Sequence, residues 1–274
     1  MWSCNLNKVV STIEDYISLT TSFTGVWFRG VASPAYKPHP RVHWNRIESQ
    51  KEETLVYSFL RDHFKYHFSN NENPWYLYAL MQHHGLPTRL LDWTRSPLVS
   101  LYFALTQGSS NDCSAVVWVL NPYILNEKVI GIDRIFCPSQ MAVRHIETNA
   151  YYNVNNRKLE TYENEIKFKL QFDSYLPANL LVGETHMRLP HPFAIETIPL
   201  DSRMSSQQSV FTIHGSDTKS LDEQFSDDVI SCIEIPASSK SQILDKLHRI
   251  GIVEDFIYCD LDSLSKRLCR EQGL

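Results

Sequence analysis

The spacing of apolar and polar residues along the chain predicts helices and short strands in irregular alternation. Apolar residues recur at three- and four-residue intervals over residues 8–19, 52–67 and 239–250, so we predict a helix over each. Asn73 and Ser96, each followed by proline, are typical N-caps and predict helices over residues 74–83 and 97–106. Short apolar runs predict strands at residues 25–29, 89–93, 114–120, 193–198, 210–214 and 229–235. Residues 131–160 follow neither pattern.

Irregularly mixed helices and strands favour an α+β fold. Three polar stretches, at residues 69–74, 108–112 and 215–228, are typical of loops between elements. No repeat or low-complexity linker divides the chain, and we therefore predict a single domain over residues 1–274.

Composition narrows the possible partners. The net charge of −5 argues against a broad electrostatic grip on nucleic acid or on a membrane, although arginines at positions 29, 41, 46, 89 and 95 allow a local basic groove. The longest apolar run, residues 115–120, is too short to cross a bilayer, and residues 1–15 lack the features of a signal peptide. The six cysteines are scattered without the spacing of a metal site, so we expect free thiols, no metal and a cytoplasmic location.

The first chemical signal is Arg29, which ends the apolar run Val26-Trp27-Phe28 and precedes Gly30. An arginine at the end of a buried strand presents a planar fork that suits phosphate, and glycine lets a ligand approach the backbone closely. The alternative is an arginine that is paired with a carboxylate at a strand edge. The pattern alone leaves both interpretations open.

The second signal is the dense polar segment over residues 82–97, QHHGLPTRLLDWTRSP. Buried polar groups need partners, so these side chains must satisfy either one another or a ligand. Thr94 and Ser96 flank a predicted helix N-terminus, where free N–H groups favour an anion. Tyr102 and Phe103 on that helix form either a wall of the cleft or part of the core.

A third, weaker signal is the polar loop before the strand over residues 210–214, where Gln207 offers an amide to a ligand hydroxyl. Other chemistries lack their motifs. His63 and His67 have the spacing of a zinc-binding pair, but no glutamate stands between them and no third ligand is evident. No phosphate-binding glycine loop and no nucleophile elbow is present.

These segments resemble the FRG domain family, named for a Phe-Arg-Gly motif that here is Phe28-Arg29-Gly30. The most specific block is similar to QHHGLPTRLLDWT at residues 82–94, continuing through Ser96-Pro97 to LYFA at residues 101–104. A later block resembles Arg203 and Gln207 with Phe211-Thr212, and a terminal block resembles residues 235–262.

FRG domains in turn resemble mono-ADP-ribosyltransferases, which implies a split mixed or antiparallel β core flanked by helices. By that comparison, Arg29 matches the strand arginine that holds the phosphates of NAD. Asp92-Trp93-Thr94 matches a hydroxyl-rich strand, of which only Thr94 keeps a hydroxyl. Gln207 falls where the family carries its catalytic glutamate.

The resemblance implies transfer of ADP-ribose from NAD, as co-substrate, to a macromolecule. Arg29, Gln207, Asp92 and His84 are expected to act in catalysis. The residues expected to bind NAD are Arg29, Gly30, Trp93, Thr94, Ser96, Tyr102 and Arg203, with Tyr102 or Trp93 stacking on the nicotinamide.

The resemblance to toxins of bacterial defence systems implies a lethal target and a neutralising antitoxin protein. RNA is the favoured acceptor, with Arg41, Arg46 or Arg95 meeting its phosphates and rings stacking on its bases. The alternatives are a protein acceptor, an NAD glycohydrolase, and a non-catalytic nucleotide-binding module.

Overall fold

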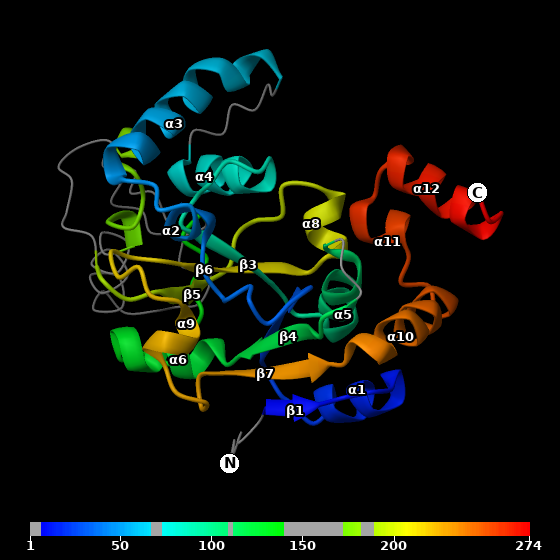
Figure 1. Cartoon of the computed structure of the whole chain (residues 1–274). Coiled ribbons are helices and arrows are strands. Elements are labelled where there is room, and N and C mark those ends of the chain that lie inside the picture. Colours follow the sequence, from blue (N-terminus) through cyan, green and yellow to red (C-terminus); the bar gives the residue numbers. More distant parts are fainter. Residues whose placement is uncertain (1–6, 67–72, 109–111, 140–171, 182–188) are drawn as a thin grey trace, which may run out of the picture.

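A computed structural model describes residues 7–66, 73–108, 112–139, 172–181 and 189–274 (Figure 1). These residues form one sheet of seven strands in the order β1-β7-β4-β2-β3-β6-β5. The strands are β1 (Asn7–Val9), β2 (Trp27–Val31), β3 (Leu90–Thr94), β4 (Ala115–Leu120), β5 (Phe193–Ile195), β6 (Ser209–Ile213) and β7 (Ile230–Ile235). β1 runs parallel to β7, and all other neighbours are antiparallel. The fold is therefore a mixed sheet combined with helices.

Helices cover both faces of this open sheet. They are α1 (Ile13–Thr20), α2 (Arg41–Trp44), α3 (Ser49–Asp62), α4 (Pro74–His83), α5 (Pro97–Thr106), α6 (Pro122–Ile130), α8 (Ser202–Ser206), α9 (Leu221–Gln224), α10 (Ala237–Arg249), α11 (Glu254–Tyr258) and α12 (Leu261–Glu271). Figure 1 shows α5, α10 and α11 gathered at one side of the molecule, and α6 and α9 at another. No helix in the described part of the chain is both long and apolar enough to cross a membrane.

The inner strand β4 explains why the core needs helices on both sides. Its six residues are all buried. Alternate side chains point to opposite faces, so one set joins a core with α1, α5 and α10 while the other joins a core with α6 and α9. A third cluster joins α3 and α4 to β3, β5 and β6. A strand buried on both faces is expected to be apolar throughout, as residues 115–120 are.

The helices predicted from capping residues are confirmed. The Asn73 side chain accepts hydrogen bonds from the first turn of α4, and Ser96 caps α5. The helix predicted over residues 8–19 is wrong at its start, because residues 7–9 pair with β7 as strand β1 and Thr12 caps a helix that begins at Ile13. Most of the ambiguous segment over residues 131–160, together with His67, lies outside the described residues.

The sheet opens between its central strand, β2, and the neighbouring strand β3. β2 and β3 are paired only where Phe28 lies opposite Thr94, whereas β2 pairs with β4 along its whole length. Beyond that single pair, no further backbone pairing joins these two strands. The Phe-Arg-Gly segment and the Asp-Trp-Thr segment therefore face each other across a gap in the sheet.

Candidate functional site

A cavity of about 330 Å³ lies where β2 and β3 separate. Ligand sites typically enclose about 300–1,000 Å³, so the volume suits a small molecule or part of a larger one. The lining residues come from β2, β3, β6, five helices and the loops next to them. They are Phe28, Arg29, Gly30, His39, Arg41, Gln82, His83, Gly85, Leu90, Leu91, Asp92, Trp93, Thr94, Phe103, Gln107, Arg203, Met204, Gln207, Ser209, Phe211 and Tyr258.

Arg29 lies at the point where the two strands part. Its Nη1 donates a 2.7 Å hydrogen bond to the main-chain oxygen of Asp92 and lies 3.9 Å from the Asp92 carboxylate. Its Nε is buried and has no hydrogen-bond partner among the described residues. Burial lowers the pKa of Arg29, Asp92 opposes that change, and nearby Arg41 adds to it. A half-buried cation with an unused donor is well placed to bind an anion.

Asp92 supplies the only carboxylate among the described residues that line the cavity. It occupies the middle of β3, where its neighbours on either side are buried and its own side chain remains 54% exposed. Gln82 holds it in place, donating from Nε2 to Asp92 Oδ2 at 2.6 Å while accepting from the Thr88 hydroxyl at 2.5 Å. The carboxylate is therefore oriented by a side chain but still accessible.

Gln207 is fixed from two directions. It ends α8, and its Nε2 donates to the main-chain oxygen of Ile257 in α11 at 3.1 Å. Its own main-chain oxygen accepts from the Thr94 hydroxyl at 2.6 Å. The next residue, Gln208, has a left-handed φ of 48°, which turns the chain from α8 into β6. Non-glycine residues rarely adopt this conformation, so the corner is held by these surrounding contacts.

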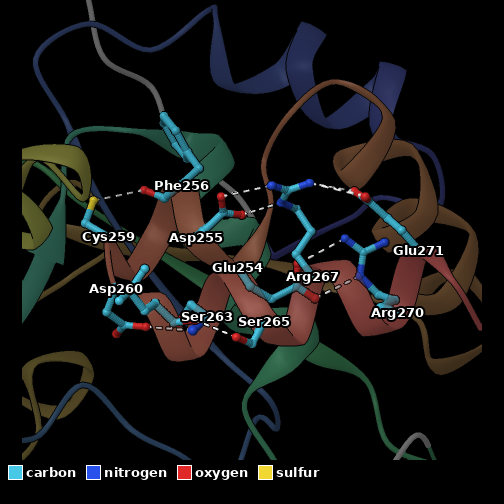
Figure 2. A network of polar contacts seen from close by, with 11 residues as sticks. Glu254, Asp255, Phe256, Cys259, Asp260, Ser263, Ser265, Arg267, Arg270 and Glu271 are labelled. Carbon is cyan, nitrogen blue, oxygen red and sulfur yellow. Dashed lines mark hydrogen bonds and ion pairs between the residues drawn. The ribbon is translucent and has the colours of Figure 1, made fainter. Parts of the chain in front are cut away.

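The C-terminal helices support this corner. Figure 2 shows Arg267 and Arg270 of α12 reaching back to acidic residues of α11, with Nε···O distances of 2.6 Å to Asp255 and 2.8 Å to Glu254. α11 in turn provides Tyr258, which lines the cavity and lies 5.2 Å from the Arg203 guanidinium. Burial raises the pKa of Tyr258, and Arg203 opposes that shift. The terminal helices thus position one wall of the cavity.

Seven of the ten residues predicted for the site line this one cavity. They are Arg29, Gly30, Asp92, Trp93, Thr94, Arg203 and Gln207. The other three, His84, Ser96 and Tyr102, do not line it. The cavity therefore brings together residues from both ends of the chain.

The three residues outside the cavity have other positions. Tyr102 is only 3% exposed and packs in the core beside α10, so it cannot stack on a ligand in this cavity. Ser96 uses its hydroxyl to cap α5. His84 ends α4, while the preceding His83 lines the cavity, where its Nε2 is 2.8 Å from Asp201.

Three of the lining residues contribute differently from the sequence-based expectation. A Cβ on Gly30 would lie 1.7 Å from the Ser100 oxygen, so this glycine admits α5 rather than a ligand. The Trp93 ring is buried and its Nε1 donates to Thr212, which excludes stacking in the cavity. The Thr94 hydroxyl is occupied, because it donates to Gln207 and accepts from the Ser96 amide.

Phe103 and Tyr258 place rings in the cavity wall, with their centroids 6.3 Å apart. Of the two rings that the sequence offered as cleft wall or core, Phe103 lines the cavity and Tyr102 does not, whereas Tyr258 and Gln82 were not singled out as site residues. Gln82 stood within the recognised polar block, and its position just before the turn at Gly85 was the signal that could have marked it. Tyr258 reaches the cavity only through the packing of α11, which no local pattern encodes.

Some polar side chains of the dense polar segment over residues 82–97 are bonded within the protein. Arg89 is 4% exposed and donates three hydrogen bonds of 2.7–3.0 Å to Glu52, which is 1% exposed. It also donates to the Gly215 oxygen at 2.7 Å, while the Tyr78 hydroxyl contacts both Glu52 and the Arg89 amide. Thr88 and Arg89 are therefore satisfied within the protein, and Asp92 remains available to a ligand.

Comparison with known proteins identifies part of this region. Residues 24–113 match the family model described as FRG domain. The matched stretch contains Arg29, Asp92 and Thr94, and it supports the FRG resemblance over about a third of the chain. Searches of the curated proteins and of the solved structures each found no match. Gln207 and Tyr258 lie outside the matched stretch.

Proposed function

We propose that the cavity binds NAD and that the protein is a mono-ADP-ribosyltransferase of the ADP-ribosyltransferase-like fold. The observation that carries this proposal is the convergence of Arg29, Asp92 and Gln207, from three different segments, on one cavity. A cation for the phosphates, an exposed carboxylate and a fixed amide are the groups that such a transfer needs.

The proposed reaction breaks the bond between C1′ of the ribose and the nicotinamide nitrogen. The bonding electrons leave with nicotinamide, and positive charge develops on the ribose. Asp92 stabilises that charge, and Arg29 holds a phosphate. A nucleophilic oxygen or nitrogen of the acceptor then attacks C1′, and its proton passes to Asp92 or His83.

Gln207 has a positioning part in this scheme. Its amide is neutral and is anchored on Ile257, so it orients a ribose hydroxyl and does not offset the developing charge. Phe103 or Tyr258, rather than Tyr102 or Trp93, stacks on the nicotinamide ring.

We propose RNA as the favoured acceptor. We further propose that the protein is a cytoplasmic toxin of a toxin–antitoxin or anti-phage defence system and that its partner is an antitoxin protein. A protein acceptor is the alternative within the same reaction class. A nucleotide-binding module without catalysis is the alternative outside it, and the neutral, anchored amide of Gln207 favours that alternative.

Incubation of the protein with NAD labelled in its adenylate part, together with separate pools of RNA, DNA and protein, tests the proposal. Label on RNA is the expected result, label on protein supports the protein-directed alternative, and nicotinamide release without labelled acceptor indicates a glycohydrolase. Asp92→Asn should slow transfer by at least about tenfold, and the exposed control Asp245→Asn should not change it. NAD binding without any nicotinamide release contradicts the enzymatic proposal.

A further inference from the structure

A second cavity of about 300 Å³ adjoins the first. Its lining is Arg29, Val31, Ala32, Tyr36, Lys37, His39, Arg41, Trp44, Gln107 and Gly108. Arg29, His39, Arg41 and Gln107 line both cavities. The two hollows therefore share a wall, and a ligand longer than either one can pass along it from one to the other.

Two exposed rings line the second cavity and not the first. Tyr36 and Trp44 are 49% and 48% exposed, although aromatic side chains of this size usually bury most of their area. Their centroids are 6.0 Å apart, and His39 lies 6.4 Å from Trp44 at its edge. An exposed ring in a hollow is a platform on which a flat base can stack.

The shared wall is cationic. Arg41 Nη1 donates to the Gly85 oxygen at 2.8 Å, and Arg29 Nη1 donates to the Asp92 oxygen. The two guanidinium groups are close enough for Arg41 to lower the pKa of Arg29. Like charges held near each other repel, and a bound phosphate relieves that repulsion while accepting hydrogen bonds from both.

The aromatic rings thus line the second cavity, the two guanidinium groups line the wall that both cavities share, and the Asp92 carboxylate and Gln207 amide line the first cavity. We propose that the second cavity is the subsite for the adenosine half of the dinucleotide, with the adenine on Trp44 and Tyr36 and the pyrophosphate between Arg29 and Arg41. This assignment rests on the proposed function, and it adds a binding site to it.

Calorimetric titration of the full-length protein with NAD, nicotinamide mononucleotide and AMP tests the assignment. Trp44→Ala should weaken binding of NAD and AMP by about tenfold or more, the usual loss for a stacked base, and leave nicotinamide mononucleotide unchanged. Trp44→Phe should restore most of the affinity because it keeps a ring. Tyr57→Ala is the matched control, since Tyr57 is 59% exposed on α3 and does not line either cavity. A melting curve of each variant establishes that it is folded.

Two results would overturn this inference while the wild-type protein still binds NAD. One is an unchanged NAD affinity in Trp44→Ala. If that variant also has a raised KM for RNA, the two rings bind the acceptor and not the adenine. The other is an equal loss for NAD and nicotinamide mononucleotide. Failure of the wild-type protein to bind either nicotinamide ligand would instead refute the proposed function itself, and this inference with it.

Discussion

The hydroxyl of Thr94 donates a 2.6 Å hydrogen bond to the main-chain oxygen of Gln207, 113 positions later in the chain. The same hydroxyl accepts from the Ser96 amide at 2.9 Å. One side chain therefore joins the end of β3, the start of α5 and the corner between α8 and β6. The relative positions of Asp92 and Gln207 across the cavity depend on this connection.

Replacement of Thr94 by valine keeps the shape and removes both hydrogen bonds. We expect the free energy of unfolding to fall by about 1–3 kcal/mol, because the Gln207 oxygen and the Ser96 amide lose a partner in a largely buried place. Urea unfolding measures the change. Thr21→Val, at an exposed hydroxyl, is the control and should cost less than about 0.5 kcal/mol. Equal effects of the two substitutions would mean that the Thr94 hydroxyl does not fasten the corner.

Gly30→Ala should destabilise the protein by about 3 kcal/mol or more. The added Cβ would lie 1.7 Å from the Ser100 oxygen and 2.6 Å from the Ala104 nitrogen, so α5 must move off β2. Gly131→Ala is the control. Gly131 has a φ of 73°, and among the described residues no atom lies within 4 Å of the position that its added methyl group would take, so the substitution should cost only about 1 kcal/mol of backbone strain. A Gly30→Ala protein as stable as the Gly131→Ala protein contradicts the close packing.

The ion pair between Arg89 and Glu52 should be costly to break and cheap to replace. Arg89→Met leaves a buried carboxylate without its cation, and we expect a loss of about 3–5 kcal/mol in the free energy of unfolding. The double variant Glu52→Leu, Arg89→Met should recover much of that loss. Arg249→Met, which breaks the exposed pair with Asp245, should cost less than about 1 kcal/mol. If the double variant is no more stable than Arg89→Met, the ion pair stabilises the protein more than the apolar pair that replaces it, which contradicts this prediction.

Stability should decline in mild acid because of His214. Burial, followed by the charges of His43, His39, Arg89 and Arg29, lowers the pKa of His214 well below its ordinary value of 6.5. The unfolded chain takes up a proton near pH 6.5 and the folded chain does not. The free energy of unfolding is therefore undiminished by His214 above that pH and falls as the pH drops below it. The slope is at most about 1.4 kcal/mol per pH unit.

Urea unfolding between pH 7.5 and pH 5 measures that slope. His214→Gln cannot titrate and should show a shallower decline than the wild-type protein. Identical slopes for the two proteins would mean that the His214 imidazole does not govern the acid response.

Local signals predicted the elements best where a few residues decide the outcome. Asn73 and Ser96, each followed by proline, fixed the starts of α4 and α5, because a cap satisfies its own helix end without help from the rest of the fold. Lys8 and Val9 show the opposite case. Their apolar spacing continues that of α1, but pairing with β7 draws them into a strand, and pairing between distant segments is not encoded locally.

The polar residues of the candidate site were predictable from the sequence, and its aromatic wall was not. Arg29 stands out at the end of an apolar run, Asp92 within the dense polar segment and Gln207 in the polar loop before a strand, and the cavity brings the three together. Which of Trp93, Tyr102, Phe103 and Tyr258 offers a ring to the cavity depends on the twist of β3 and the packing of α5 and α11. Sequence spacing alone does not determine such orientations, so the aromatic wall had to come from the structure.

Titration of NAD into the wild-type protein and into Arg29→Gln tests the central claim most directly. Glutamine keeps the stem of the side chain and a polar donor near the position of Nε but carries no charge for a phosphate, so we predict at least about tenfold weaker binding with a melting temperature within a few degrees of wild type. Arg249→Gln, at an exposed arginine on α10, should bind NAD as the wild-type protein does. Equal NAD affinity in the wild-type protein and Arg29→Gln, or no binding to either, would contradict the account.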